Sequence, residues 1–261
     1  MGKPNKENFR AYWNLDEASG NAIDALGNHD LTETSGTIES AEGGRDFELG
    51  DTEYFIMASH ADVAFADEPF TVGAWVKPES QPAVMRILSK LNTGAGKREY
   101  RLDYNDVNDR YDFGVSPAGG TPPTIVTANN YGAVPATTRA FVLAWHDPNA
   151  DKIYIQVDNG TPDEASYSLG CNAGTADFIL GCYLNQASPS SFYDGIMWSA
   201  FVYAGVMTAD ERTAMYNGGT PLKWIDFGPP NVKTINGVAI GSAKTVSGIS
   251  VASIKSIQGI T

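Results

Sequence analysis

Long hydrophobic runs, cysteine and histidine are all scarce in this chain of 261 residues. Its longest apolar runs span about six residues, far below the roughly 20 that a transmembrane helix requires, so no membrane insertion is expected. The two cysteines and the scattered His29, His60 and His146 form no zinc-binding pattern. A disulfide between Cys171 and Cys182 remains open, but no export signal is visible, which favours two buried free thiols.

Basic charge is also scarce, and the formal net charge is −13. The stretch from Asn231 onward is the exception, because it carries three lysines and none of the 31 acidic residues. The acidic remainder of the chain disfavours phosphate backbones, so no nucleic-acid partner is expected. For the basic, apolar tail two interpretations stay open: it docks on a partner, or its lysines block edge-to-edge aggregation of strands.

Helix patterns are rare, whereas alternation of apolar and polar residues recurs throughout the chain, bounded by Gly, Pro, Asn and Asp clusters. In the stretch 70–77 the alternation places Phe70, Val72, Ala74 and Val76 on one face, and the residues between them on the other. So many short strands predict an all-β fold with two packed antiparallel sheets.

One helix is predicted near residues 208–217. Thr208 followed by Glu211 forms a capping box, and Asn217-Gly218 suits a left-handed end. After the helix, the chain is expected to leave the domain through Pro229-Pro230. The predicted organisation is a domain over 1–224, a linker over 225–231 and a tail over 232–261.

The tail is an 11-residue repeat that places Lys233, Lys244 and Lys255 in register. In each unit a glycine follows Asn, Ser or Gln, which predicts a strand, a turn and a second strand. A repeat of this size is stable only when a neighbour stacks on it, so the tail needs a partner. The residues expected to carry assembly are Ile235, Gly237, Val238, Val246, Gly248, Ile249, Ile257, Gly259 and Ile260.

Four motifs in order resemble a known family. They are "AYWNLDEASGNAIDALGNHDLT", "FTVGAWVKPE", "WHD…KIYIQVDNG" and "FYDGIMWSAFVYAGVMTADERTAMYNGG". Together they resemble the concanavalin A-like, laminin G-like jelly-roll superfamily over about residues 9–224, which implies a jelly-roll sandwich. The fold carries lectins, hydrolase accessory domains, adhesion modules and enzymes alike, so the resemblance leaves the function open.

The resemblance also implies where a calcium ion would bind. In the family an Asp in a D-x-x-G-N segment helps to hold the ion, and Asp24, Gly27 and Asn28 match that segment. A second acid is expected after the "DG" pair of the late strand, but Trp198 stands there, and an indole cannot ligate a hard cation. The preferred interpretation is that Asp24 and Asn28 cap a loop; calcium is the alternative, and no other cofactor is expected.

No catalytic constellation is evident. No predicted strand presents the paired carboxylates of a glycosidase, and Glu48, Asp51 and Glu53 are expected to lie around a turn. No G-x-S-x-G elbow occurs either. The sequence therefore predicts a protein that is not an enzyme.

Carbohydrate binding is better supported, because jelly-roll lectins use loop aromatics for stacking and Asn or Asp for sugar hydroxyls. One candidate loop offers Asn129, Asn130 and Tyr131, and a second offers residues of "NQASPSSFYD". The alternative is that Tyr131 only packs its own loop. The candidates from the second loop are Asn185, Tyr193 and Asp194.

The tail also resembles C-terminal runs of bacteriophage structural proteins that carry laminin G-like domains. The leading prediction is a virion surface protein, assembled in the host cytoplasm and joined to other virion proteins or to copies of itself through residues 232–261. Host-surface glycans are a further expected partner. The alternative is a carbohydrate-binding lectin or a glycoside-hydrolase accessory module.

Overall fold

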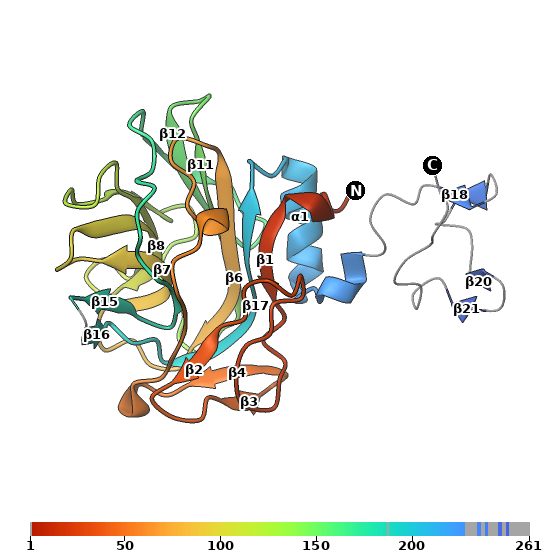
Figure 1. Cartoon of the computed structure of the whole chain (residues 1–261), viewed down its shortest axis with the longest axis horizontal. Coiled ribbons are helices and arrows are strands. Elements are labelled where there is room, and N and C mark those ends of the chain that lie inside the picture. Colours follow the sequence, from red (N-terminus) through yellow and green to blue (C-terminus); the bar gives the residue numbers. More distant parts are fainter. Residues whose placement is uncertain are drawn as a thin grey trace.

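The computed structural model describes residues 2–186 and 188–227, and four two-residue strands between 234 and 250. The described body is a sandwich of two antiparallel sheets with one short α-helix, as predicted from the sequence. Figure 1 shows the sheets face to face, with β6, β17 and β1 in one layer and β7, β8, β15 and β16 in the other.

The first sheet has eight strands in the order β13-β12-β11-β6-β17-β4-β3, and β1 pairs with β17 beside this path. The N-terminal strand therefore pairs with a strand about 190 residues later, with Tyr12 opposite Phe201. The bounds are β1 (Phe9–Trp13), β3 (Glu39–Ala41), β4 (Gly44–Phe47), β6 (Phe70–Pro78), β11 (Ala140–Asp147), β12 (Lys152–Val157), β13 (Asp163–Ser166) and β17 (Gly195–Ala204).

The second sheet has nine strands in the order β10-β9-β8-β7-β14-β5-β2, with the hairpin β15–β16 attached to β7. Short turns link β7 to β8 and β8 to β9, so consecutive strands are neighbours. The bounds are β2 (Thr32–Thr34), β5 (Tyr54–Met57), β7 (Met85–Asn92), β8 (Lys97–Asn105), β9 (Arg110–Val115), β10 (Thr124–Thr127), β14 (Phe178–Leu180), β15 (Tyr183–Asn185) and β16 (Ser188–Ser190).

The main core lies between the two sheets, and strand alternation fills it. Phe70, Val72, Ala74 and Val76 of β6 are buried in this core, whereas Trp75 belongs to a second cluster on the opposite face. The alternation predicted for this strand is therefore confirmed. Burial of large apolar side chains at about 1.5–3 kcal/mol each supplies the main driving force for the sandwich.

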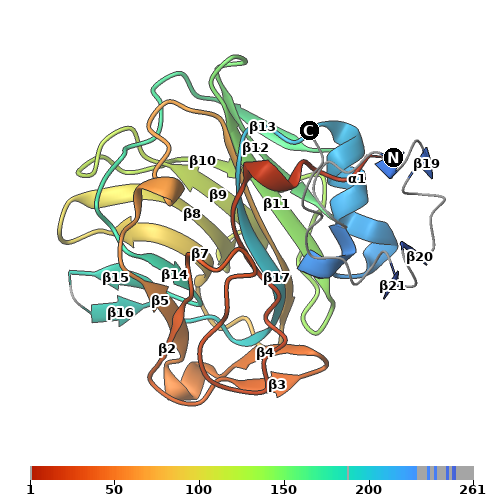
Figure 2. The ribbon, with the colours of Figure 1, turned by 45° about the vertical axis from the view of Figure 1, so that its right-hand side comes forward.

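The outer face of the eight-stranded sheet is also apolar, and the helix α1 (Ala209–Tyr216) covers it (Figure 2). The predicted capping box is present: Glu211 N–H donates to the Thr208 hydroxyl, and the Glu211 carboxylate accepts from Thr208 N–H at 2.8 Å. The Tyr216 ring stacks on Trp75 with their centroids 5.8 Å apart. The capping box therefore determines where the helix begins, and the apolar outer face of the sheet determines where the helix packs.

Within residues 2–186 and 188–227, five segments form short 3-10 turns, and the last of them extends the domain. The Trp224–Phe227 turn places the Trp224 and Phe227 rings 5.5 Å and 5.2 Å from the ring of Phe9. Phe227, which falls in the segment 225–231 expected to be a linker, thus packs on the body, whereas Ile225 is exposed. The other turns are Lys6–Asn8, Leu49–Asp51, Ala61–Val63 and Asn217–Gly219. Among the described residues no helix is long and apolar enough to cross a membrane.

In the tail the described backbone forms two strand pairs 11 residues apart. Strand β18 (Thr234–Ile235) pairs with β19 (Val238–Ala239), and β20 (Thr245–Val246) pairs with β21 (Ile249–Ser250). Both pairs are antiparallel, in agreement with the predicted strand, turn, strand unit. The remaining assembly residues, Gly237, Gly248, Ile257, Gly259 and Ile260, lie outside the described residues.

The two cysteines are free and buried. This confirms the interpretation that the sequence favoured. Burial raises the pKa of both thiols far above the usual value, so neither is a reactive thiolate.

Candidate functional site

A small pocket lies where β10 of one sheet approaches β12 and β13 of the other. The loop after β10 forms one wall, and the turn between β12 and β13 forms the other. The pocket encloses about 230 Å³. Its lining residues are Ala128, Asn130, Tyr131, Val157, Asp158, Gly160, Thr161 and Asp163.

Hydrogen bonds fix both walls of this pocket. Asn130 N–H donates to Asp163 Oδ2 at 2.9 Å, and the Asn130 side-chain amide donates to the Pro162 carbonyl at 3.3 Å. On the other wall, Asp158 adopts a left-handed conformation with φ of 54° and accepts from Phe141 N–H at 2.9 Å. The β12–β13 turn and the loop after β10 are therefore held to each other and to the sheet.

The pocket carries partly desolvated polar groups. Burial raises the pKa of Asp158, and the Phe141 N–H bond opposes that rise. Burial also raises the pKa of Tyr131, and the nearby charge of Asp158 adds to it. The phenol therefore stays protonated and can donate a hydrogen bond, while the carboxylates and the amide supply acceptors and donors. An aromatic ring beside such groups is a suitable environment for a hydroxyl-rich ligand.

Of the three neighbouring residues predicted in this loop, Asn129, Asn130 and Tyr131, the last two line the pocket. Asn129 is exposed beside them but does not line it. Tyr131 is only partly buried, with its ring 6.1 Å from that of Tyr111. Sequence reasoning missed Asp158 and Asp163, although the Asp158-Asn159-Gly160 turn that presents the first of them was recognised as a turn.

The second predicted loop does not form one site. Tyr193 is 0% exposed and lies in the core, 6.1 Å from the Phe47 ring, so it cannot stack on a sugar, and that part of the prediction is wrong. Asp194 accepts hydrogen bonds from Leu49 N–H and the Ser80 hydroxyl, which ties three segments together. Asn185 is exposed on β15 and accepts from the Thr93 hydroxyl.

Asp24 is 2% exposed, and backbone amides surround its carboxylate. One oxygen accepts from Tyr12 N–H and Leu26 N–H, and the other accepts from Asn28 N–H and His29 N–H. These bonds are those of the loop-capping interpretation. Because four N–H donors already occupy the carboxylate, a calcium ion would have to displace some of them, and calcium binding here stays a prediction.

An acidic pocket of about 450 Å³ lies around β3, β4 and the turn Leu49–Asp51. The predicted turn between Glu48 and Glu53 is thus present. Carboxylate oxygens of Asp46, Glu48 and Glu79 lie within 4.8 Å of one another. Burial, followed by the charges of Glu79 and Glu48, raises the pKa of Asp46 to about 6. This cluster could not be predicted from the sequence, because Asp46 belongs to β4 whereas Glu79 follows β6.

Comparison with known proteins agrees with this architecture. Residues 49–211 match the family described as the concanavalin A-like lectin/glucanases superfamily, and the chain belongs to that family. No curated protein matches the chain.

Solved structures similar to this chain share the fold at low sequence identity. Domain 4 of a GH43 extracellular arabinanase from Geobacillus stearothermophilus, solved with arabinotriose, is 16% identical with a TM-score of 0.55, covering 80% of this chain and 98% of that one. The binding domain of botulinum neurotoxin serotype G is 10% identical with a TM-score of 0.60, covering 81% and 51%. A Trypanosoma rangeli sialidase mutant with trans-sialidase activity is 13% identical with a TM-score of 0.60, covering 83% and 33%.

Proposed function

We propose that this protein is a carbohydrate-binding domain and that the pocket around Tyr131 holds the sugar. The observation that carries this proposal is the convergence of the Tyr131 ring, the Asn130 amide and the carboxylates of Asp158 and Asp163 on one small pocket. Its volume lies below the roughly 300–1,000 Å³ of pockets for drug-sized ligands, so it suits a short or terminal sugar unit. The arabinotriose complex of the similar arabinanase domain supports the class of ligand.

The proposal is a binding function without catalysis. The pocket offers hydrogen bonds and a ring face, and its two carboxylates are each engaged by a backbone N–H group. Recovery of a bound oligosaccharide in intact form after long incubation is the expected result. Release of free sugar would instead direct attention to the acidic cluster of Asp46, Glu48 and Glu79.

A glycan array followed by titration calorimetry tests the proposal. Replacing Tyr131 with alanine is expected to weaken binding about tenfold, corresponding to about 1.4 kcal/mol of lost ring contact. Asn130→Ala is also expected to weaken binding, whereas its neighbour Asn129→Ala, which lies outside the pocket, serves as the matched control. Unchanged affinity of a folded Tyr131→Ala protein would exclude this pocket, and an array without any bound glycan would exclude the function.

Attachment to a virion through residues 232–261 remains a second candidate, based on the 11-residue repeat and the strand pairs that recur with it. Its test is independent of the glycan assay. The chain ended after Pro230 is expected to fold as a monomer that no longer assembles, as measured by light scattering. Assembly that persists without the tail would contradict this role.

A further inference from the structure

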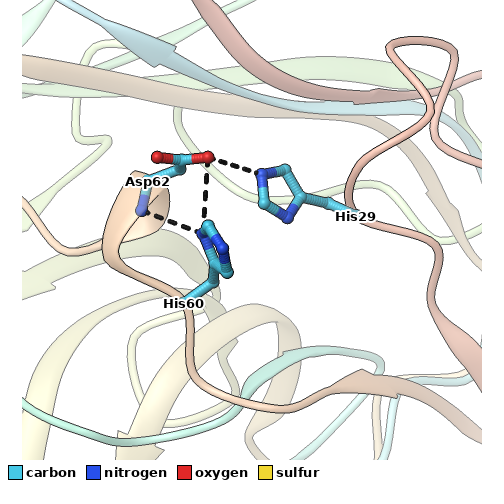
Figure 3. A group of neighbouring side chains, drawn as sticks. All are labelled: His29, His60 and Asp62. Atoms are coloured by element: carbon cyan, nitrogen blue, oxygen red, sulfur yellow. Dashed lines mark hydrogen bonds and ion pairs between the residues drawn. The ribbon is translucent and has the colours of Figure 1, made fainter.

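Two of the three histidines, far apart in the sequence, meet beside an aspartate. His29 lies in the loop between β1 and β2, and His60 and Asp62 lie at the turn Ala61–Val63 that follows β5. Figure 3 shows both imidazole rings directed at the carboxylate of Asp62. From the sequence alone the histidines were interpreted as scattered, because His29 and His60 come together only when these two loops pack against each other.

The distances among the three groups fit a metal site. His29 Nε2 lies 3.0 Å from Asp62 Oδ2, and His60 Nδ1 lies 3.4 Å from the same oxygen. The three ligand atoms all lie within 4.8 Å of one another. Tetrahedral zinc with bonds of about 2.0–2.1 Å places neighbouring ligand atoms about 3.3 Å apart. Small side-chain shifts would therefore bring all three atoms around one ion.

His29 is held rigidly before any ion binds. Its side chain is only 3% exposed, its N–H donates to Asp24 Oδ2 at 3.1 Å, and its carbonyl accepts from the Trp13 indole at 2.7 Å. Gly27, with φ of 82°, makes the turn that returns the chain from Asp24 to His29. The segment that resembles a calcium motif thus serves, through Asp24, to fix the position of His29.

The other two groups are open to solvent. The side chains of His60 and Asp62 are 52% and 50% exposed, so an ion can enter and keep a water molecule in its fourth position. His60 Nδ1 now accepts from Asp62 N–H at 3.2 Å, and this bond would be exchanged for the bond to the metal. Because Asp62 is half exposed, water can take over that N–H group at little cost.

We propose that His29, His60 and Asp62 form a binding site for a divalent transition metal, with Zn²⁺ as the probe of choice. Two imidazoles and one carboxylate match the ligand preferences of zinc, whereas calcium requires oxygen ligands. The site is distinct from the Tyr131 pocket, whose lining includes none of these three residues. It therefore stands independently of the carbohydrate proposal.

Calorimetry on the full, untagged chain after chelation tests the site with Zn²⁺ alone. We expect one ion per chain with a dissociation constant on the order of 1 μM or below. At an excess of about a hundred dissociation constants, Zn²⁺ is expected to raise the melting temperature by about 5–10 °C. Ca²⁺ is expected neither to bind at this site nor to raise the melting temperature.

Two surface variants distinguish Zn²⁺ binding at this site from Zn²⁺ binding elsewhere and from a loss of folding. His60→Ala and Asp62→Asn alter exposed side chains, so both should remain folded while losing at least about tenfold in Zn²⁺ affinity. Glu79→Gln, in the acidic cluster, is the control expected to bind normally. The proposal fails if the parent chain does not bind Zn²⁺. The three residues would then form only an ion pair between the histidines and Asp62. The proposal also fails if Glu79→Gln abolishes binding while the other two variants retain it.

Discussion

The two outer faces of the sandwich are built from opposite chemistry. The outer face of the eight-stranded sheet is aromatic and is covered by α1 and the turn Trp224–Phe227. The outer face of the nine-stranded sheet carries buried charges, Arg86 on β7 and Asp103 on β8, which are directly opposite each other. A polar side chain on alternate positions of a strand therefore does not mean a solvated face in this protein.

The buried charges are paired. Lys90 Nζ lies 2.6 Å from Glu99 Oε1, with both side chains 0% exposed, and it also donates to the Ala176 carbonyl. This pair lies on the core side of the sheet, because Lys90 is opposite Phe178 and Tyr100. On the outer face Arg86 lies 2.6 Å from Asp103, and the Tyr183 ring from the β15–β16 hairpin lies over the guanidinium of Arg86. Such pairs make a small net contribution to stability when intact, and they are costly to break because one charge is left without a partner.

The largest effect is expected when the buried pair of Lys90 and Glu99 is broken. Lys90→Met leaves Glu99 buried without its cation and should lower the free energy of unfolding by about 3–5 kcal/mol, as measured by urea denaturation. The double variant Lys90→Met/Glu99→Met should recover part of this loss. Recovery should be incomplete, because Ala176 loses partners for its N–H and carbonyl groups. A single variant as stable as the parent would show that the charges are solvated.

Removing the C-terminal cover tests the aromatic face. A chain ended after Lys223 lacks Trp224 and Phe227, which are partly buried against Phe9 and Tyr12. It should lose about 2–3 kcal/mol of stability, given about 1.5–3 kcal/mol for each fully buried large side chain. The matched control is the chain ended after Pro230, which retains the cover. Equal thermal unfolding of the two chains would mean that the cover is not part of the domain.

The helix cap on the same face should have a smaller effect. Thr208→Ala removes the side-chain oxygen that accepts from Glu211 N–H and should cost about 1 kcal/mol in urea denaturation. Thr208→Ser keeps that oxygen and should be close to the parent. If serine and alanine were equally destabilising, the methyl group of Thr208, and not its hydroxyl, would account for the loss.

The smallest effect concerns Asp46, which is opposite Ile196 and so shares the outer face of the eight-stranded sheet. Its pKa is raised from 3.8 to about 6, chiefly by burial. The folded state therefore binds this proton more tightly than the unfolded state. The contribution of the protonated Asp46 carboxyl to the free energy of unfolding is lost as pH rises from about 4 to 6. Asp46→Asn should flatten stability across that window in urea melts. An identical pH profile would show that Asp46 titrates normally.

Much of the fold could be predicted because its signals are local. Two-residue alternation in β6, the Thr208–Glu211 cap and the Asp158-Asn159-Gly160 turn each depend on a few neighbouring residues. The candidate site was predictable only in part. Asn130 and Tyr131 were found as a polar and an aromatic residue in one long loop, whereas their partner Asp163 comes from a hairpin about 30 residues away.

Tyr193 shows the limit of such local signals. In the sequence it follows Ser190-Ser191-Phe192 and precedes an Asp-Gly pair, and this mixture of serines and turn residues is typical of a loop. In the structure it is fully buried near Phe47 of β4, and its N–H donates to the carbonyl of Gly181, the residue that follows β14, at 2.7 Å. Exposure of an aromatic residue in a loop depends on what packs over it, and that is a long-range property.

By itself, the sequence determined the class of fold, the strand faces, the single helix and the repeat of the tail, because periodicity and capping are properties of neighbouring residues. Only the tertiary structure decided which loops share a surface. It placed His29 beside His60 and Asp62, and Asn130 beside Asp163. It also buried Lys90 and Glu99 together as an ion pair. These contacts follow from sheet order and register, such as the pairing of β1 with β17, which no local pattern specifies.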